Sequence, residues 1–137
     1  ATDGTVHLIY GSGDAVFHCR STDSGATFTK PQEACRVPNM SLGMRRGPRI
    51  SVAGNAVVVT AVGGKQGKGR DGDVLAWHSA DGGATWQGPV RVNDAADSAR
   101  EGLHGMASGP DGSVWATWLD LREKGTEVYV SKSTDGG

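Results

Sequence analysis

The sequence predicts an all-β fold, a β-propeller fragment of about two and a half four-stranded antiparallel blades. Three observations predict this fold. The 137 residues include 22 glycines but only two phenylalanines and two tyrosines, a composition typical of many tight turns between short strands. A Ser-x-Asp-x-Gly motif occurs three times at a nearly constant spacing. The first two copies stand between short apolar runs, and such runs indicate strands.

The repeated motif occupies residues 21–28 (STDSGATF), 79–86 (SADGGATW) and 133–137 (STDGG). Its copies start 58 and then 54 residues apart, slightly more than the period of about 40–50 residues that four-stranded propeller blades show. A single octapeptide of this kind is weak evidence, whereas three copies at a regular period are the signature of a repeat architecture. We therefore interpret each motif as the same turn in successive blades.

The motif residues suit a hairpin turn that is held together by its own side chains. Aspartate can accept hydrogen bonds from the amides of the turn, and glycine can adopt the positive φ that the turn requires. The aromatic residue at the end of the motif is expected to bury its ring at the start of the next strand. The residues assigned to this structural role are Ser21, Asp23, Gly25, Phe28, Ser79, Asp81, Gly83, Trp86, Ser133, Asp135 and Gly137. A calcium-binding loop is the disfavoured alternative, because the later ligand positions are missing, and no metal site is predicted.

The segments around the motifs divide the chain, 1–137, into one complete blade and two incomplete ones. The complete blade, 39–97, is expected to have strands at 47–54, 55–62, 73–79 and 87–93. The incomplete first blade, 1–38, is expected to have strands at 5–11, 15–21 and within 29–37. The truncated third blade, 98–137, is expected to have strands at 104–110, 112–120 and 126–133. Three consecutive valines at 57–59 predict a strand that is buried on both faces.

The basic residues are concentrated in the loops expected at the end of the blades opposite the motif turns. We call this end the loop-end face, and it comprises residues 41–49, 65–73, 98–104 and 119–127. These segments carry nine of the 14 lysines and arginines, namely Arg45, Arg46, Arg49, Lys65, Lys68, Arg70, Arg100, Arg122 and Lys124. The clustering favours a site for a carboxylate, sulfate or phosphate group. The alternative is that surface loops are polar in general.

Charge and motif chemistry exclude several other function classes. The formal net charge of −1 argues against nucleic acid and against a membrane surface as partners, and no apolar run is long enough to span a membrane. The glycine-rich segment 63–73 is not a phosphate-binding P-loop, because Gly69 follows Lys68 and Val62 stands where the first glycine should be. No cofactor is predicted.

The cysteines leave open whether a disulfide forms, and one of the histidines is a candidate for a binding site. Cys19 and Cys35 are expected on adjacent strands, and their spacing is not that of a zinc site. They form either a disulfide, if the protein is exported, or two small buried hydrophobic contacts. Among the histidines, only His104, beside Glu101 at the start of an expected inner strand, is expected near a binding site.

The motif resembles the Asp box, also called the BNR repeat, and the chain resembles the sialidase superfamily, whose propellers have six blades. Arg49-Ile50 is followed by a strand, a Gly-rich loop, a strand and SADGGATW; sialidases have an arginine motif, a loop aspartate and an Asp box in that order. The resemblance implies that Arg49 is the first arginine of the triad that binds the sialic acid carboxylate. It also implies that Asp71, or less favourably Asp73, is the catalytic acid/base.

The resemblance further implies a glycoside hydrolase of exo-α-sialidase type, which cleaves terminal sialic acid or a related anionic sugar. Trp118-x-Asp120-x-Arg122 is similar to segments of bacterial sialidase-like proteins. The substrate-binding residues would be Arg46, Arg49, Arg70, Glu101, His104, Asp120 and Arg122. The alternative is a non-catalytic Asp-box propeller that binds an anionic glycan or a protein partner. The remaining blades of a parent propeller are an expected partner, and a secreted or periplasmic location is expected although the first residues lack the features of a signal peptide.

Overall fold

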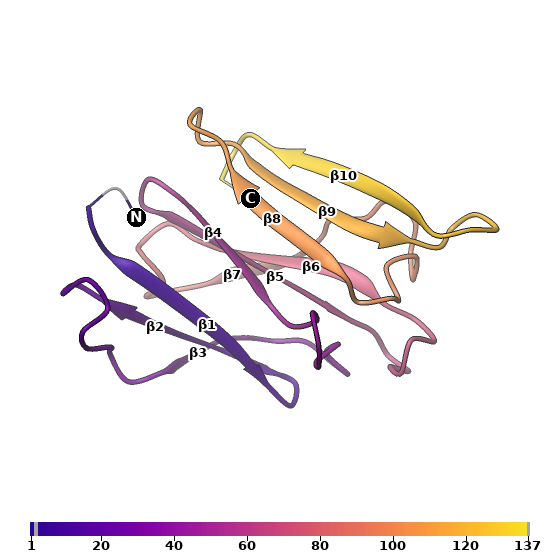
Figure 1. Cartoon of the computed structure of the whole chain (residues 1–137), viewed down its shortest axis with the longest axis horizontal. Coiled ribbons are helices and arrows are strands. Elements are labelled where there is room, and N and C mark those ends of the chain that lie inside the picture. The colour runs from indigo at the N-terminus through magenta and orange to yellow at the C-terminus, as the bar shows by residue number, and fades with distance from the viewer. Residues whose placement is uncertain (2, 137) are drawn as a thin grey trace.

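The structure, a computed structural model that describes residues 1 and 3–136, consists of three antiparallel β-sheets lying side by side (Figure 1). The described residues form ten strands and no helix, which confirms the predicted all-β class. The strands are β1 (Val6–Ser12), β2 (Ala15–Ser21), β3 (Gln32–Arg36), β4 (Arg49–Ala53), β5 (Ala56–Gly63), β6 (Asp73–Ser79), β7 (Gln87–Arg91), β8 (His104–Ser108), β9 (Val114–Asp120) and β10 (Glu127–Ser133).

The sheets follow the up-and-down order of propeller blades. The middle sheet has the order β4-β5-β6-β7, which is the predicted complete blade. The first sheet, β1-β2-β3, contains the second to fourth strands of that pattern, and the third sheet, β8-β9-β10, contains the first to third. The two inner strands β4 and β8 lie next to each other. The predicted two and a half blades are therefore present as three sheets, each turned relative to the next.

The core fills the two spaces between neighbouring sheets. One cluster joins the first sheet to the second and consists of Val16, Cys35, Val37, Met40, Val59, Ala61 and Trp77. A second cluster joins the second sheet to the third and consists of Val62, Val74, Ala99 and Trp118. The three valines of β5 at 57–59 are at most 2% exposed, as predicted for a strand covered on both faces. Sheet stacking thus explains why β5 is apolar throughout.

The first two motif turns are held by the hydrogen bonds that their residue types predict. Ser21 Oγ donates to Asp23 Oδ1 (2.6 Å) and accepts from the amide of Gly25 (2.8 Å), and Thr27 donates its amide and hydroxyl to Asp23 (2.9 and 2.6 Å). These contacts, with the Ser21 hydroxyl as the largest cause, lower the pKa of Asp23 to about 2. The turn is therefore closed by an ionised carboxylate.

The second motif turn repeats this pattern, and the third begins it. Ser79 Oγ donates to Asp81 Oδ1 (2.7 Å), and the amide of Thr85 donates to the same oxygen (2.9 Å). In the third turn Ser133 Oγ donates to Asp135 Oδ1 (2.6 Å). Gly137, the last residue assigned to the motif, lies outside the described residues. The repeated sequence motif therefore corresponds to a repeated turn geometry.

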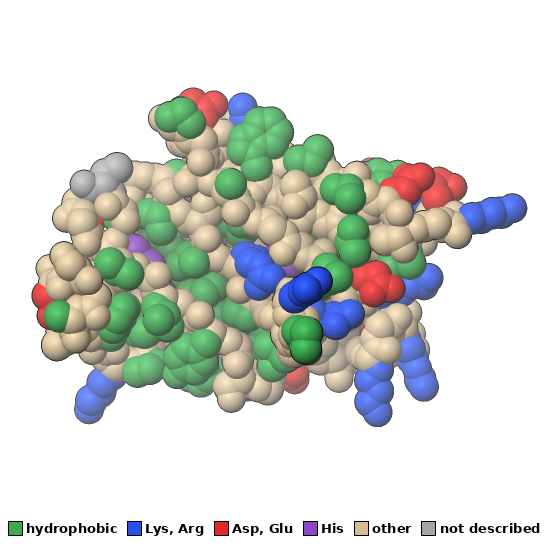
Figure 2. All heavy atoms as spheres, viewed as in Figure 1, with side chains coloured by type: hydrophobic (Ala, Val, Ile, Leu, Met, Phe, Trp, Pro, Cys, Tyr) green, Lys and Arg blue, Asp and Glu red, His purple; other side chains and the backbone are tan. Residues whose placement is uncertain are grey.

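The prediction that the motif aromatic residues are buried is confirmed in part for Trp86 and is wrong for Phe28. The Trp86 ring packs half-buried against the core cluster between the first and second sheets, with its edge toward His18 (centroids 5.5 Å apart). Phe28 is 41% exposed. Among the described residues, the turn that carries Trp86 has the first sheet to pack on, whereas no sheet lies against the turn that carries Phe28. Apolar side chains also gather over β1 of that sheet (Figure 2), where Leu8 and Tyr10 are each 41% exposed.

The cysteines form two small buried contacts and not a disulfide. β2 and β3 pair as expected, but Cys35 lies opposite Val16, three positions from Cys19 along β2. Both thiols are free and buried. Burial raises the pKa of the Cys35 thiol to about 12, so it stays protonated at neutral pH and packs as a hydrophobic residue.

Candidate functional site

The segments of the loop-end face are joined by backbone hydrogen bonds. The amide of Ser41 donates to Val62 O (2.8 Å), and the amide of Ala99 donates to Gly72 O (2.9 Å). The fourth segment is attached through the amide of Leu121, which donates to Ser98 O (2.9 Å). Loops from three sheets therefore form one continuous surface, as the strand order predicts. Figure 2 shows lysine and arginine side chains gathered over this end, around the segment that precedes β4 and the loop that follows β5.

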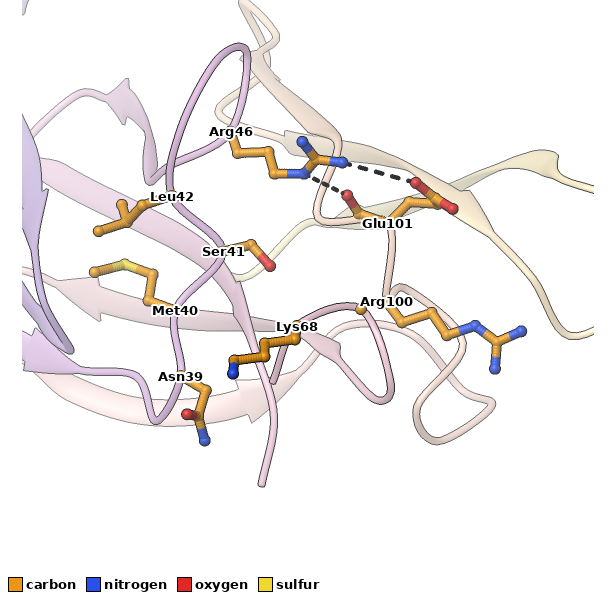
Figure 3. A pocket seen from close by; sticks show the side chains of 9 residues that line it. Asn39, Met40, Ser41, Leu42, Arg46, Lys68, Arg100 and Glu101 are labelled. Carbon is orange, nitrogen blue, oxygen red and sulfur yellow. Dashed lines mark hydrogen bonds and ion pairs between the residues drawn. The ribbon is translucent and has the colours of Figure 1, made fainter. Parts of the chain in front are cut away.

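A pocket of about 320 Å³ opens in the loop-end face (Figure 3). It is lined by Asn39, Met40, Ser41, Leu42, Arg46, Lys68, Gly69, Arg100 and Glu101. These residues come from the link between the first and second sheets, the loop between β5 and β6, and the link between the second and third sheets. The pocket thus combines three cationic side chains with one carboxylate and two apolar side chains.

Arg46 and Glu101 connect the two inter-sheet links across the pocket. Arg46 Nε donates to the backbone oxygen of Glu101 (2.7 Å), and its Nη2 lies 3.8 Å from Glu101 Oε2. The side chains are 38% and 43% exposed, so the ion pair itself contributes little to stability. Its effect is to orient the guanidinium along the pocket wall, where an incoming anion can reach it.

Lys68 and Arg100 supply positive charge that the protein does not neutralise. In the part of the chain that the structure describes, neither Lys68 Nζ nor the Arg100 guanidinium has a hydrogen bond or an ion pair. Lys68 extends toward Asn39, while the Arg100 head group points away from Ser41 and the other labelled residues (Figure 3). Lys68 is therefore available to a ligand as it stands, and Arg100 is available if its side chain turns inward.

The loop that carries Lys68 is held rigidly by Asp71. The Asp71 carboxylate accepts hydrogen bonds from the amides of Lys65 (2.6 Å), Gln66 (2.9 Å) and Gly67 (2.8 Å). From the other side, Asn39 Nδ2 donates to the backbone oxygens of residues 64 and 65 (both 3.0 Å). Lys68 follows directly with a left-handed φ of 55°. These contacts shape the loop before any ligand binds.

This geometry gives Asp71 a structural role and disfavours the acid/base role expected from the resemblance. The side chain is only 7% exposed. Its hydrogen bonds, with the Gln66 amide as the largest cause, lower its pKa below the usual value for aspartate. A general acid must hold a proton and reach the leaving group, whereas Asp71 is ionised and faces its own loop. Asp73, the second candidate, accepts hydrogen bonds from Asn93 Nδ2 and the amide of Asp97 at the same oxygen (both 2.7 Å).

Arg49 and His104 lie together where the inner strands begin. Arg49 donates to backbone oxygens of its own link, those of Arg45 (2.8 Å), Gly47 (3.0 Å) and Pro48 (3.2 Å). Burial and then the nearby Arg49 charge lower the pKa of His104 to about 4, so the imidazole is neutral at pH 7. Arg49 is thus held in the bare protein, and its expected role in binding a carboxylate stays a prediction.

The His104 ring bridges the second and third sheets. Its Nε2 lies 3.0 Å from the Thr60 hydroxyl oxygen on β5. Its Nδ1 is buried and has no hydrogen-bond partner among the described residues. His104 is therefore placed at the inner strands, as expected, but outside the pocket lining.

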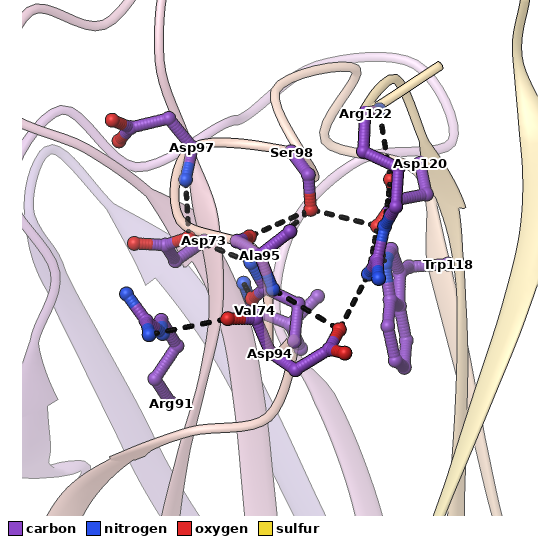
Figure 4. Close-up of polar contacts among 11 residues, drawn as sticks. Asp73, Val74, Arg91, Asp94, Ala95, Asp97, Ser98, Trp118, Asp120 and Arg122 are labelled. Atoms are coloured by element: carbon purple, nitrogen blue, oxygen red, sulfur yellow. Dashed lines mark hydrogen bonds and ion pairs between the residues drawn. The ribbon is translucent and has the colours of Figure 1, made fainter.

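Asp120 and Arg122 belong to a network of intramolecular contacts (Figure 4), and their expected role as substrate ligands stays a prediction. Asp120 is 1% exposed and accepts hydrogen bonds from Ser98 Oγ (2.7 Å), Trp118 Nε1 (2.8 Å) and Arg122 Nε (2.9 Å). Arg122 also donates to Asp94 (2.6 Å), and its guanidinium lies 4.0 Å from the centre of the Tyr129 ring. Nε and Nη2 of Arg122 are thus engaged by carboxylates, and the network anchors the loop-end face.

Two of the expected substrate-binding residues line the pocket, and several lining residues were not among those expected. Arg46 and Glu101 line the pocket, whereas Arg70 is exposed outside it. The expected substrate-binding residues did not include Asn39, Met40, Ser41, Leu42, Lys68, Gly69 or Arg100, although Lys68 and Arg100 were among the basic residues of the loop-end face. The Pro38-Asn39 pair signals the turn that carries Asn39, because proline followed by asparagine suits a turn with a positive φ, and Asn39 has a left-handed φ of 50°.

Comparisons with known proteins give similarity in fold only. No protein-family model and no curated protein matches the chain. The structure superposes on the NanB sialidase from Streptococcus pneumoniae with a TM-score of 0.64 at 16% identity, covering 92% of this chain and 19% of that one. It superposes on the Hadza microbial sialidase Hz136 with a TM-score of 0.66 at 16% identity, covering 98% of this chain and 34% of that one. The chain has a sialidase-like fold. It spans only 19% and 34% of these two sialidases, and the assignment of its three turns as Asp boxes stays a prediction.

The described residues contain no helix of the length and apolarity needed to cross a membrane. They also contain no group of three or more His, Cys, Asp or Glu side chains placed to hold a metal ion.

Proposed function

We propose that the loop-end face binds an anionic carbohydrate in the pocket lined by Arg46, Lys68 and Arg100. The observation that carries this proposal is the pair of cations, Lys68 and Arg100, that line a concave surface without protein partners. Other arginines at the same end, Arg49 and Arg122, are occupied by backbone oxygens and carboxylates. Lys68 and Arg100 are therefore unpaired cations at a place where a ligand has room.

The pocket wall favours a sugar acid over a polyanion. Met40 and Leu42 offer apolar contact to the C–H faces of a pyranose ring, and Ser41 offers a hydroxyl to its polar groups. Glu101 at the rim repels a second negative charge, which disfavours nucleic acid and highly sulfated chains. One carboxylate on a neutral ring matches this distribution best.

The test is a calorimetric titration of the protein with N-acetylneuraminate and with an uncharged N-acetylhexosamine. The acid should bind and the neutral sugar should bind far more weakly. Lys68→Ala should weaken acid binding about tenfold, the effect of losing one charge-assisted hydrogen bond. Lys30→Ala should leave the affinity for the acid unchanged, because Lys30 follows the first motif turn and does not line the pocket. Equal binding of the two sugars, or equal effects of the two variants, would contradict the proposal.

Hydrolysis of a terminal sialic acid, as in an exo-sialidase, is the second candidate function. The fold similarity to two sialidases favours it, and Arg49 stands at the start of an inner strand, where the resemblance places a carboxylate-binding arginine. Catalysis through Asp71 would require the loop 64–71 to release its carboxylate from three amides. A non-catalytic propeller that binds an anionic glycan or a protein needs no such rearrangement.

Hydrolysis of an aryl sialoside and of a natural sialoside decides between these candidates. If Asp71 is the general acid, Asp71→Asn should lower turnover of the natural substrate by about 10²–10⁴-fold. The aryl sialoside should suffer less, because its leaving group needs little protonation. Binding of N-acetylneuraminate without cleavage of either substrate would leave the non-catalytic function standing.

A further inference from the structure

A smaller polar cavity, of about 190 Å³, lies between the first sheet and the second motif turn. We call it the motif-end cleft. One wall is formed by His18 and Arg20 of β2, by Thr29 and by Gln32 of β3. The other wall is formed by residues 82–84 of the second motif turn. Both walls are parts of the described chain, at the end of the blades opposite the loop-end face.

The motif-end cleft contains a cation that has no counter-ion. Within the described part of the chain, the Arg20 guanidinium has no hydrogen bond and no ion pair. A Cβ on Gly82 would lie 3.6 Å from Arg20 Nη1, so the guanidinium reaches across the cleft to the second motif turn. The aspartate of that turn, Asp81, accepts the amide and the hydroxyl of Thr85 (2.9 and 2.6 Å) and closes its own turn. No carboxylate is among the described residues that line the cleft, and an anion is the ligand that suits it.

Neutral donors lie beside Arg20. Thr29 Oγ1 accepts a hydrogen bond from the Arg20 amide (3.1 Å), which leaves the hydroxyl proton for another acceptor. Gln32 is the strand partner of His18, and its side-chain amide has no hydrogen bond among the described residues. The lining therefore offers guanidinium, hydroxyl and amide donors, which match an oxyanion with several acceptor oxygens.

His18 connects the cleft to a second imidazole ring. His18 Nε2 lies 3.0 Å from His7 Nδ1, and the two rings are stacked with their centroids 5.2 Å apart. The His18 side chain is buried, and the Trp86 ring packs against it edge-on. The hydrogen bond between the two rings holds one proton when both are neutral. One further proton on the pair would place a positive charge beside the cleft.

The surroundings of this pair keep it neutral at pH 7. Burial is the largest cause that lowers the pKa of His18 and the pKa of His7, and the Arg20 charge also lowers both. On His7 the Ala1 amino group acts in the same direction, and the Asp3 carboxylate acts in the opposite one. Among the described residues, β3 and the second motif turn bring no charged side chain to the cleft. An anion at Arg20 would offset the repulsion between Arg20 and a protonated pair, so anion binding and proton uptake favour each other.

We propose that the motif-end cleft binds a small oxyanion, sulfate or phosphate, either free or as an ester. Arg20 holds the anion, and Thr29 and Gln32 donate hydrogen bonds to its oxygens. The His7–His18 pair takes up one proton from solvent as the anion binds. Because the two walls come from neighbouring sheets, the bound anion also joins the first sheet to the second motif turn. This site is independent of the carbohydrate pocket in the loop-end face.

The test is a titration of the protein with sulfate at pH 7 and at pH 5, at constant ionic strength, followed by NMR of the histidine ring protons. Sulfate keeps its charge over this range, so a change in affinity reports on the protein. Saturable shifts of the His7 and His18 signals are expected, with binding at least about threefold tighter at pH 5. A parallel titration with N-acetylglucosamine 6-sulfate separates the two sources of the anion, because the tighter ligand identifies whether the cleft takes a free ion or an ester.

Variants separate the motif-end cleft from other positive charges of the protein. Arg20→Ala should weaken sulfate binding about tenfold at pH 5 and remove the gain on acidification. Lys30→Ala is the matched control, since Lys30 follows Thr29 in the chain and does not line the cleft. Lys68→Ala alters the loop-end pocket and should leave the shifts of the two rings unchanged, so a failure of either proposal is seen separately. Arg20 is exposed, and urea midpoints verify that the variants fold.

Three results would overturn the proposal. The first is the absence of saturable shifts of the His7 and His18 signals. The second is an equal loss of affinity in Arg20→Ala and Lys30→Ala, which indicates attraction by general surface charge. The third is an affinity that stays constant or falls as the pH decreases from 7 to 5, because it shows that the histidine pair takes up no proton with the anion.

Discussion

Two glycines at the same place in successive motif turns allow the contact between a turn and the preceding sheet to be measured by itself. Gly25 and Gly83 have nearly identical left-handed backbones, with φ of 90° and 89°. A Cβ on Gly25 would meet no atom within 4 Å, whereas a Cβ on Gly83 would lie 2.6 Å from His18 Nδ1. The His18 ring has little freedom to move aside, because it is bonded to His7 (3.0 Å) and packed against Trp86.

The expected difference follows from these distances. Gly25→Ala should lower the free energy of unfolding by about 1–2 kcal/mol, the cost of a left-handed non-glycine residue. Gly83→Ala adds an overpacked contact of about 1–3 kcal/mol, so its total loss should be about 2–5 kcal/mol. Urea unfolding of both variants measures the difference. In a His18→Ala background, Gly83→Ala should cause no more loss than Gly25→Ala. Equal losses in the wild-type background would refute packing of the second turn on the first sheet.

Three further predictions concern the loop-end face and the buried histidines. Asp71→Asn should speed hydrogen exchange of the three amides it accepts from and lower affinity for N-acetylneuraminate, although Asp71 does not line the pocket; unchanged exchange would contradict its structural role. Burial lowers the pKa of His18 and lowers that of His104 to about 4. The unfolded chain therefore binds more protons than the folded chain below pH 6.5, and the free energy of unfolding should fall as the pH decreases from 6.5 toward 4. A urea midpoint that rises as the pH decreases over this range would refute neutral, buried imidazoles. Asp120→Asn should lower the melting temperature much more than Asp94→Asn, because Asp120 is 1% exposed and Asp94 is on the surface; equal shifts by calorimetry would contradict the anchoring network.

The strands and turns were predictable because their signals are local. The motif turn is closed by contacts within five residues, such as Ser79 with Asp81, and so the sequence period alone places it. Burial of β5 was predictable from three adjacent valines. The exposure of Phe28 was not, because it depends on whether another sheet lies against the turn, and a motif does not carry this information.

The roles of charged residues were predicted less well, for a physical reason. The sequence predicted correctly that Asp71 lies in the loop after β5. The role of Asp71 depends on the conformation of that loop, in which three backbone amides donate hydrogen bonds to its carboxylate. The same holds for Arg122, whose Nε and Nη2 donate to Asp120 and Asp94. A sequence indicates that cations gather at one end. Only tertiary structure distinguishes cations that are already paired from those, such as Lys68, that are not.

The most direct test of an anionic-carbohydrate site is a crystal structure of the protein with N-acetylneuraminate. The account predicts the sugar in the pocket between residues 39–46, 68–69 and 100–101, with its carboxylate within hydrogen-bonding distance of Lys68, Arg46 or a reoriented Arg100. The loop bonds of Asp71 should be unchanged in the complex. A sugar bound elsewhere on the protein, with this pocket empty and Lys68 facing solvent, would contradict the account.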